Sequence, residues 1–217
     1  MFSSASTTEP PLPMAFTSLP VGDFNTANVT NMSHMFYMCY QLTSFSVDNF
    51  NTANVTKMDY MFACFNHQTT QCPGELTTLN LANWNFTNVT TTAKMFDRCE
   101  KLNDGLTFPA VTNFKSLTDL NFMFSQCRSL SPAKLGSIVG TWDFTSNTKF
   151  NTTFNNFATN SGKPNFIIRP TMLAGGDYAN FAVRQKYTTH DGKILYIGGS
   201  ADSKNCCLTT EKGEYTE

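Results

Sequence analysis

A five-residue phrase, Met-Phe-x-x-Cys, recurs along the chain and limits its fold more than any other feature. Three full copies, one shifted copy and one weak copy occur, at Met35–Cys39, Met95–Cys99, Met123–Cys127, Met61–Phe65 and Thr153–Phe157. They begin 26 to 34 residues apart. A unit of this length cannot bury a core alone, so its recurrence predicts a stack of similar units.

A second phrase precedes the first at a fixed offset. Phe24–Thr30 and Phe50–Thr56 are identical copies of Phe-Asn-Thr-Ala-Asn-Val-Thr, and Trp84–Thr90 is a variant. Between the Met-Phe phrases, segments such as Leu42–Val47 and Leu76–Leu81 alternate apolar and polar residues. This alternation is typical of half-buried strands. The predicted fold is a β-rich solenoid of about five leucine-rich-repeat-type coils over residues 21–160, since such repeats run about 20 to 29 residues.

The predicted interior consists of columns of apolar residues. One column lies three residues before each Met-Phe phrase and another three residues after the Cys position; they hold Met32, Met58, Thr92, Leu120, Phe150 and Leu42, Leu102, Leu130. Each buried side chain stabilises the fold by about 1.5–3 kcal/mol, against roughly 1.5 kcal/mol of ordering cost per residue. One coil alone is therefore unstable, whereas a capped stack of coils can fold.

The cysteines of the phrase are interpreted as packing residues. Phe65 and Phe157 replace them in two copies, and thiol chemistry does not survive replacement by a phenyl ring. Buried Cys behaves as a small hydrophobic residue. Cys64 and Cys72 differ, because they bracket an insertion and are a candidate disulfide. The chain has seven cysteines, and the role of the adjacent pair 206–207 stays open.

Composition excludes several classes of partner. Charged residues make up 14% of the chain and the formal net charge is −1, so no basic stripe is present to bind nucleic acid. No run of about 18 apolar residues is present, so membrane insertion is not expected. The first 20 residues form a Ser/Thr/Pro-rich arm without the basic and apolar regions of a secretory signal peptide.

The combined pattern Phe-Asn-Thr-x-Asn-Val-Thr-x-Met-x-x-Met-Phe-x-x-Cys-x-x-Leu resembles the BspA-like leucine-rich repeats of bacterial, mycoplasmal and protist surface proteins. Residues 24–49 and 50–65 match best, 84–102 and 112–130 well, and 142–157 loosely. The resemblance implies a solenoid displayed at a cell surface or outside the cell. It also implies a role in adhesion or protein–protein contact without catalysis.

The repeat also creates N-x-[ST] sequons, at Asn28, Asn31, Asn54, Asn85, Asn88 and Asn151. Such sites are candidates for glycosylation in a eukaryotic secretory pathway. Alternatively, Asn occupies the bend between coils while the neighbouring Val points inward. Both interpretations stay open, because the sequon arises from the repeat itself.

From residue 161 the repeat stops. Residues 163–170 are predicted to form a short strand bounded by prolines. Residues 185–189 and 193–197 flank His190-Asp191-Gly192, which predicts a β-hairpin with an Asp-Gly turn. A stack needs its open end covered. Residues 161–217 are therefore interpreted as a C-terminal cap that contains this hairpin and ends in a polar tail.

No catalytic, cofactor-binding or metal site is expected. His34, His67 and His190 are scattered, and no Gly-rich phosphate loop is present. The candidate binding face consists of the polar positions of two alternating segments: Thr43, Ser44, Ser46, Thr77, Thr78 and Asn80. Two functions follow from the sequence. The first is an adhesion or recognition module that binds protein partners; the second is a structural subunit that joins copies of itself through its non-repeat ends. An ice-binding face is a minor third interpretation, because the Thr pattern is irregular.

Overall fold

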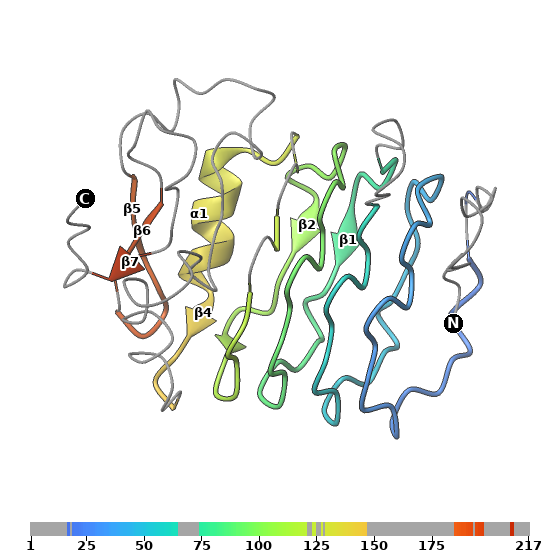
Figure 1. The fold of residues 1–217 in the computed structure, drawn as a ribbon, viewed down its shortest axis with the longest axis horizontal. Helices are drawn as coiled ribbons and strands as arrows, with labels where there is room; N and C mark the ends of the chain where they lie inside the picture. Colours follow the sequence, from blue (N-terminus) through green and yellow to red (C-terminus); the bar gives the residue numbers. More distant parts are fainter. Residues whose placement is uncertain are drawn as a thin grey trace, which may run out of the picture.

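The computed structural model describes residues 17, 19–64, 74–120, 123–124, 127, 129–146, 185–192, 194–197 and 209–210. Successive repeats lie side by side along the long axis of the molecule, from blue at the N-terminal side to yellow (Figure 1). We call residues 24–49 coil 1, 50–83 coil 2, 84–111 coil 3 and 112–141 coil 4. Parallel bridges join equivalent residues of the four coils in one column: Asn31, Lys57, Thr91 and Asp119. A leucine-rich-repeat-type solenoid stays a prediction, which these parallel contacts at repeat spacing support.

Regular strands are short and also join neighbouring coils. β1 (Leu79–Asn80) pairs in parallel with β2 (Leu106–Thr107), and β3 (Thr112–Asn113) pairs in parallel with β4 (Trp142–Asp143). The predicted alternating segment 42–47 contains no strand, and in 76–81 only β1 is regular. Segment 42–47 belongs to coil 1, and the N–H and Oγ1 of Thr77 in coil 2 both donate to its Thr43 carbonyl.

The helix α1 (Pro132–Gly140) was not expected from the sequence. It begins after Ser131, whose Oγ accepts a hydrogen bond from the Lys134 N–H, with a proline at its first position. Ser and Pro are the preferred residues at these two positions. It ends at Thr141, whose N–H donates to the Ile138 and Val139 carbonyls.

A three-stranded antiparallel sheet lies beyond coil 4. β5 (Gln185–Thr188) pairs with β6 (Ile194–Ile197), and β6 pairs with β7 (Thr209–Thr210). Gly192 in the connection between β5 and β6 has a φ of 76°, which glycine adopts without strain. The His190 N–H donates to the Trp142 carbonyl, so the hairpin contacts the chain just after coil 4 (Figure 1). The predicted strand 163–170 lies outside the described residues.

The interior contains the predicted columns. The rings of Phe36, Phe62, Phe96 and Phe124, one from each coil, stack 5.4–5.5 Å apart with planes within 8° of parallel. All described members of the two flanking columns are buried, from Met32 to Leu130. Stacked aromatic pairs add about 0.5–1.5 kcal/mol beyond the area that they bury. The Met-Phe phrase is therefore a packing device, as predicted.

The second phrase connects the coils through its threonines and asparagines. The N–H and Oγ1 of Thr56 both donate to the Thr30 carbonyl, and Thr90 donates in the same way to Thr56. The Asn54 and Asn88 side-chain amides donate to the carbonyls of Ala27 and Ala53 in the preceding coil. These bonds explain why coils 2 and 3 both have Asn and Thr at these positions.

The Met-Phe side has the opposite hydrogen-bond direction. The N–H groups of Met32, His34, Phe36 and Met38 donate to carbonyls at alternate residues of coil 2, at Lys57, Asp59, Met61 and Ala63. His34 and Met38 have φ angles of 60° and 63°. Because these residues are left-handed, every second peptide group in this segment points its N–H toward the next coil.

Candidate interaction surface

The polar residues of the predicted binding face lie on the surface of coils 1 and 2. Thr43, Ser44, Ser46, Thr78 and Asn80 are exposed and Thr77 is half-buried. The apolar partners in the alternation lie inside: Leu42, Val47, Leu76, Leu79 and Leu81 are buried, and Phe45 is half-buried. The period of two thus predicts which side of each segment faces solvent, although most of it is not regular strand.

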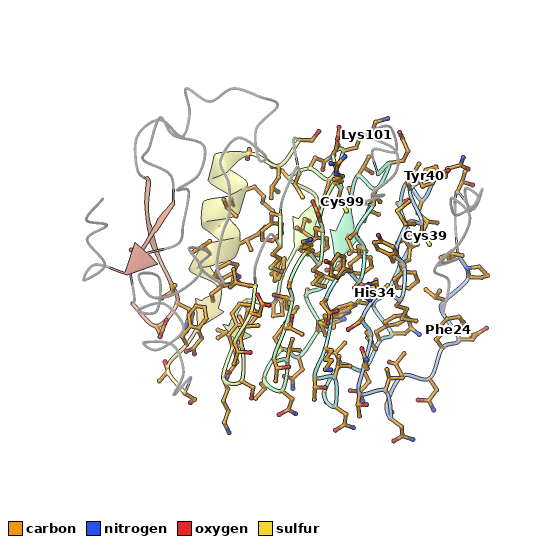
Figure 2. The ribbon with its side chains drawn as sticks, viewed as in Figure 1. Phe24, His34, Cys39, Tyr40, Cys99 and Lys101 are labelled. Carbon is orange, nitrogen blue, oxygen red and sulfur yellow. The ribbon has the colours of Figure 1, made fainter. Side chains whose placement is uncertain are left out.

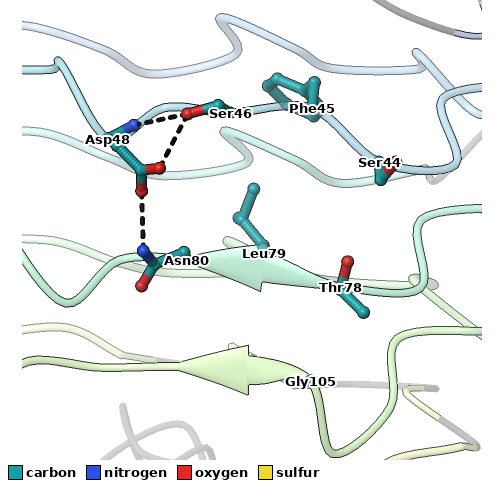
Figure 3. Close-up of a pocket in the computed structure, with 8 residues that line it drawn as sticks. All are labelled: Ser44, Phe45, Ser46, Asp48, Thr78, Leu79, Asn80 and Gly105. Carbon is teal, nitrogen blue, oxygen red and sulfur yellow. Dashed lines mark hydrogen bonds between the residues drawn. The ribbon is translucent and has the colours of Figure 1, made fainter.

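Four of these residues line a hollow of about 340 Å³ (Figure 3). Ser44, Ser46, Thr78 and Asn80 form part of its lining; Thr43 and Thr77 do not. The remaining lining residues were not predicted: Phe45, Asp48, Leu79 and Gly105. The hollow spans three coils, because Gly105 comes from coil 3.

The rim of the hollow holds one carboxylate in a hydrogen-bond network. Ser46 Oγ donates to Asp48 Oδ2 at 3.0 Å, and Asn80 Nδ2 donates to Asp48 Oδ1 at 2.7 Å. Thr107 Oγ1 in turn donates to Asn80 Oδ1 at 2.5 Å. The network crosses coils 1, 2 and 3 and directs its hydrogens toward Asp48 (Figure 3).

The hollow also has an apolar part. Phe45, which is half-buried, and the exposed Thr78 contribute carbon surface, whereas Leu79 is buried beneath them. A Cβ at Gly105 would overlap Thr78 Cγ2, so glycine at this position lets the Thr78 methyl group lie against the backbone of coil 3. A charged rim beside carbon surface suits a ligand group that is itself partly apolar.

Sequence reasoning missed Asp48 and Gly105 for identifiable reasons. Asp48 follows the alternating segment by one residue, so it lay outside the pattern that defined the face. Gly105 follows Asn103-Asp104, which is a turn signal with no indication of a ligand. The side-by-side arrangement of coils brings both to the hollow, and no pattern within one repeat encodes it.

Five of the six sequon asparagines are exposed, and Asn151 lies outside the described residues. Two of the five join neighbouring coils, because the side-chain amides of Asn54 and Asn88 donate hydrogen bonds to the preceding coil. Asn31 and Asn85 accept hydrogen bonds from the N–H groups two residues further on, at Ser33 and Thr87. The bend interpretation thus explains most of these asparagines, and glycosylation stays a prediction.

The described cysteines are buried thiols: Cys39, Cys64, Cys99 and Cys127. Burial raises the pKa of Cys39 to about 11 and holds that of Cys127 well above its ordinary value. A hydrogen bond with Cys64, followed by burial, raises the pKa of Cys99. The predicted buried thiols of the column are confirmed. The bridge from Cys64 to Cys72 stays a prediction, because Cys72 lies outside the described residues.

A second surface feature is a ladder of side chains at the left-handed positions before the Met-Phe phrases of coils 1, 2 and 3: His34, Tyr60 and Lys94. The His34 ring stacks on Tyr60 with centroids 4.8 Å apart, and Lys94 Nζ lies 5.0 Å from the Tyr60 centroid. Figure 2 shows His34 midway along coil 1, while Tyr40 and Lys101 lie toward the upper ends of their coils. The ladder joins coils 1, 2 and 3 by cation–π and stacking contacts.

The described part of the chain holds neither a metal cluster nor a membrane-spanning helix. No group of three or more His, Cys, Asp or Glu residues is arranged there to hold a metal ion. None of the helices in the same residues has the length and hydropathy to span a membrane.

Repeated side-by-side contacts, a continuous apolar interior and a polar outer face define a repeat protein. The chain belongs to the family described as Mycoplasma protein of unknown function, DUF285, whose model matches residues 1–134 and 75–165. No match is found among curated proteins or among solved structures.

Proposed function

We propose that this chain is a non-catalytic repeat module that mediates protein–protein contact at a cell surface or outside the cell, as its resemblance to BspA-like leucine-rich repeats implies. The proposed architecture is a β-rich solenoid with a C-terminal cap. One observation carries the proposal: the exposed polar positions of adjacent coils converge on one hollow. A side-chain surface assembled from several coils is the usual way in which stacked repeats bind partners.

The test is a binding assay with a matched pair of variants. The purified chain is immobilised, and extracellular matrix and cell-surface proteins are passed over it by surface plasmon resonance. Ser44→Arg places a bulky charge on the hollow, and we expect it to weaken binding at least tenfold. Ala110→Arg, at an exposed position outside the hollow, should leave binding unchanged. Equal affinities of the two variants would contradict a role for this face.

The edge of coil 1 favours a second candidate function, a structural subunit of a larger assembly. In coils 2 and 3, the backbone carbonyls on the Met-Phe side accept hydrogen bonds from the preceding coil. The equivalent carbonyls of coil 1 belong to Asn31, Ser33 and Met35. Within the described residues these three carbonyls have no donor. Unpaired backbone edges template association with another chain. Sizing and negative-stain imaging separate the candidates, since regular polymers support assembly and discrete monomers oppose it.

A further inference from the structure

The carboxylate of Asp48 is the most distinctive group of the hollow. Its two oxygens accept bonds from Ser46 Oγ and Asn80 Nδ2, and the Asp48 N–H donates to Ser46 Oγ at 3.2 Å. Asp48 is thus held in one orientation by neutral donors. Fixing a group before binding lowers the entropy cost of recognition.

No cation in the described part of the chain neutralises this carboxylate. The ion pairs there join His34 to Asp59 and Lys101 to Glu75, and none involves Asp48. A carboxylate that accepts hydrogen bonds from neutral groups keeps lone pairs for a further donor. The hollow therefore has at its rim an exposed negative charge that no ion pair of the described residues involves.

Shape and charge together select one kind of occupant. Carbon surface from the half-buried Phe45 and from the exposed Thr78, whose methyl group lies against Gly105, lines the same hollow as the carboxylate. Lysine and arginine have an apolar stem that packs on carbon and a charged head. A neutral apolar group would leave Asp48 without a partner, and an acidic group would be repelled.

We propose that the hollow receives a basic side chain, lysine or arginine, from a protein partner, with its stem over Phe45 and the Thr78 methyl group and its cation on Asp48. This inference rests on the proposed function and names the partner chemistry of the same face. The contact is a charge-assisted hydrogen bond, which is shorter and stronger than a bond between neutral groups. Its location at the surface makes it sensitive to salt.

The test uses three short peptides as probes: acetyl-Gly-Lys-Gly-amide and its norleucine and glutamate analogues. Binding to the whole chain is followed by NMR shifts of the Ser44, Thr78 and Asn80 amides. We expect the lysine peptide to bind with a Kd on the order of millimolar. The norleucine peptide should bind at least fivefold more weakly, and the glutamate peptide should give no saturable shift.

Two variants locate the cation. Asp48→Asn should weaken binding of the lysine peptide about tenfold. Asp23→Asn, which removes an exposed carboxylate outside the hollow, should leave this binding unchanged. Ser44→Lys supplies the cation from the chain itself and should also block the peptide, without altering Asp48. Equal binding of lysine and norleucine peptides, or unchanged binding to both hollow variants, would overturn the inference.

The same variants separate this inference from the proposed function. If a protein partner binds the Asp48→Asn variant but not the Ser44→Arg variant, the result supports the binding face and refutes the inference that a basic side chain binds Asp48. Saturable, Asp48-dependent binding of the lysine peptide without any protein partner supports the hollow and counts against the broader function.

Discussion

Single residues in this protein have roles that depend on the coil next to them. Thr52 shows this best, because its Oγ1 donates to the Asn85 carbonyl and also accepts from the Asn85 N–H. The same side chain in isolation would be an ordinary solvated threonine. Burial of Thr52, with 2% of its surface exposed, is possible because both functions of its hydroxyl are satisfied.

Thr52→Val should therefore destabilise the protein more than Thr56→Val. The first change leaves a buried N–H and a carbonyl without the hydroxyl, with an expected cost of about 2–3 kcal/mol. The second removes one hydroxyl bond, while the Thr56 N–H still donates to the Thr30 carbonyl, so the cost should stay below about 1 kcal/mol. Urea unfolding measures both. Equal losses would mean that the Thr52 hydroxyl does not join coils 2 and 3.

The two tryptophans offer a second comparison at the same scale. Trp84 Nε1 donates to the Val47 carbonyl at 3.2 Å, whereas the buried Trp142 Nε1 has no partner in the described structure. Both changes to Phe remove similar volume. Trp84→Phe should therefore cost about 1 kcal/mol more than Trp142→Phe, because it alone breaks a hydrogen bond. Thermal unfolding of the two variants tests the difference, and a larger loss at residue 142 would refute it.

The buried Cys39 thiol should make the stability of the folded protein depend on pH. The pKa of Cys39 is about 11 in the folded protein against an ordinary value of 9.0, because burial disfavours the thiolate. Its contribution to stability is thus complete below pH 9 and is lost as the pH rises toward 11. The melting temperature should fall across this interval, and Cys39→Ala should make the fall shallower. An identical slope in the variant would exclude Cys39 as a cause.

At the scale of elements, local sequence explains α1 more fully than it explains the strands. Ser131 caps the helix and also binds Asp104 of coil 3, through Oγ at 2.9 Å and N–H at 3.2 Å. Ser131→Ala should cost about 1–2 kcal/mol, from the cap and the bond to coil 3 together. Asp104→Asn, which keeps one of the two oxygens that accept these bonds and leaves the cap intact, should cost less. Circular dichroism with urea unfolding compares them.

The buried columns of the fold could be predicted from the sequence, but its helix and strands could not. Repeat length and period-two alternation identify the buried columns, because Met32, Met58 and Leu102 recur at fixed offsets. They overestimate strand content, because the coils pair at isolated bridges. The cap of α1 at Ser131-Pro132 was a readable signal that the β-rich pattern obscured. The hollow could be predicted only in part, because Asp48 and Gly105 meet through the stacking of coils.

At the scale of the whole molecule, the coils are interchangeable modules. Coils 1 and 2 begin with identical phrases, so a second copy of residues 24–49 inserted after residue 49 would meet matching neighbours on both sides. The lengthened chain should fold with an equal or higher melting temperature, because each interface adds to the stability of a stack. Insertion of only residues 24–36 should unfold it, since it shifts every column. Gel filtration and calorimetry test both chains.

The opposite hydrogen-bond directions on the two sides of each coil have an electrostatic consequence. Along the Met-Phe side the peptide dipoles point one way, as in an α-helix, whose aligned dipoles sum to about half a charge at each end. Along the Thr30–Thr56–Thr90 column the N–H groups point the other way. The two rows therefore oppose each other within every coil. A stack of this kind therefore lengthens by whole repeats with a smaller macrodipole than a stack in which every such bond points the same way.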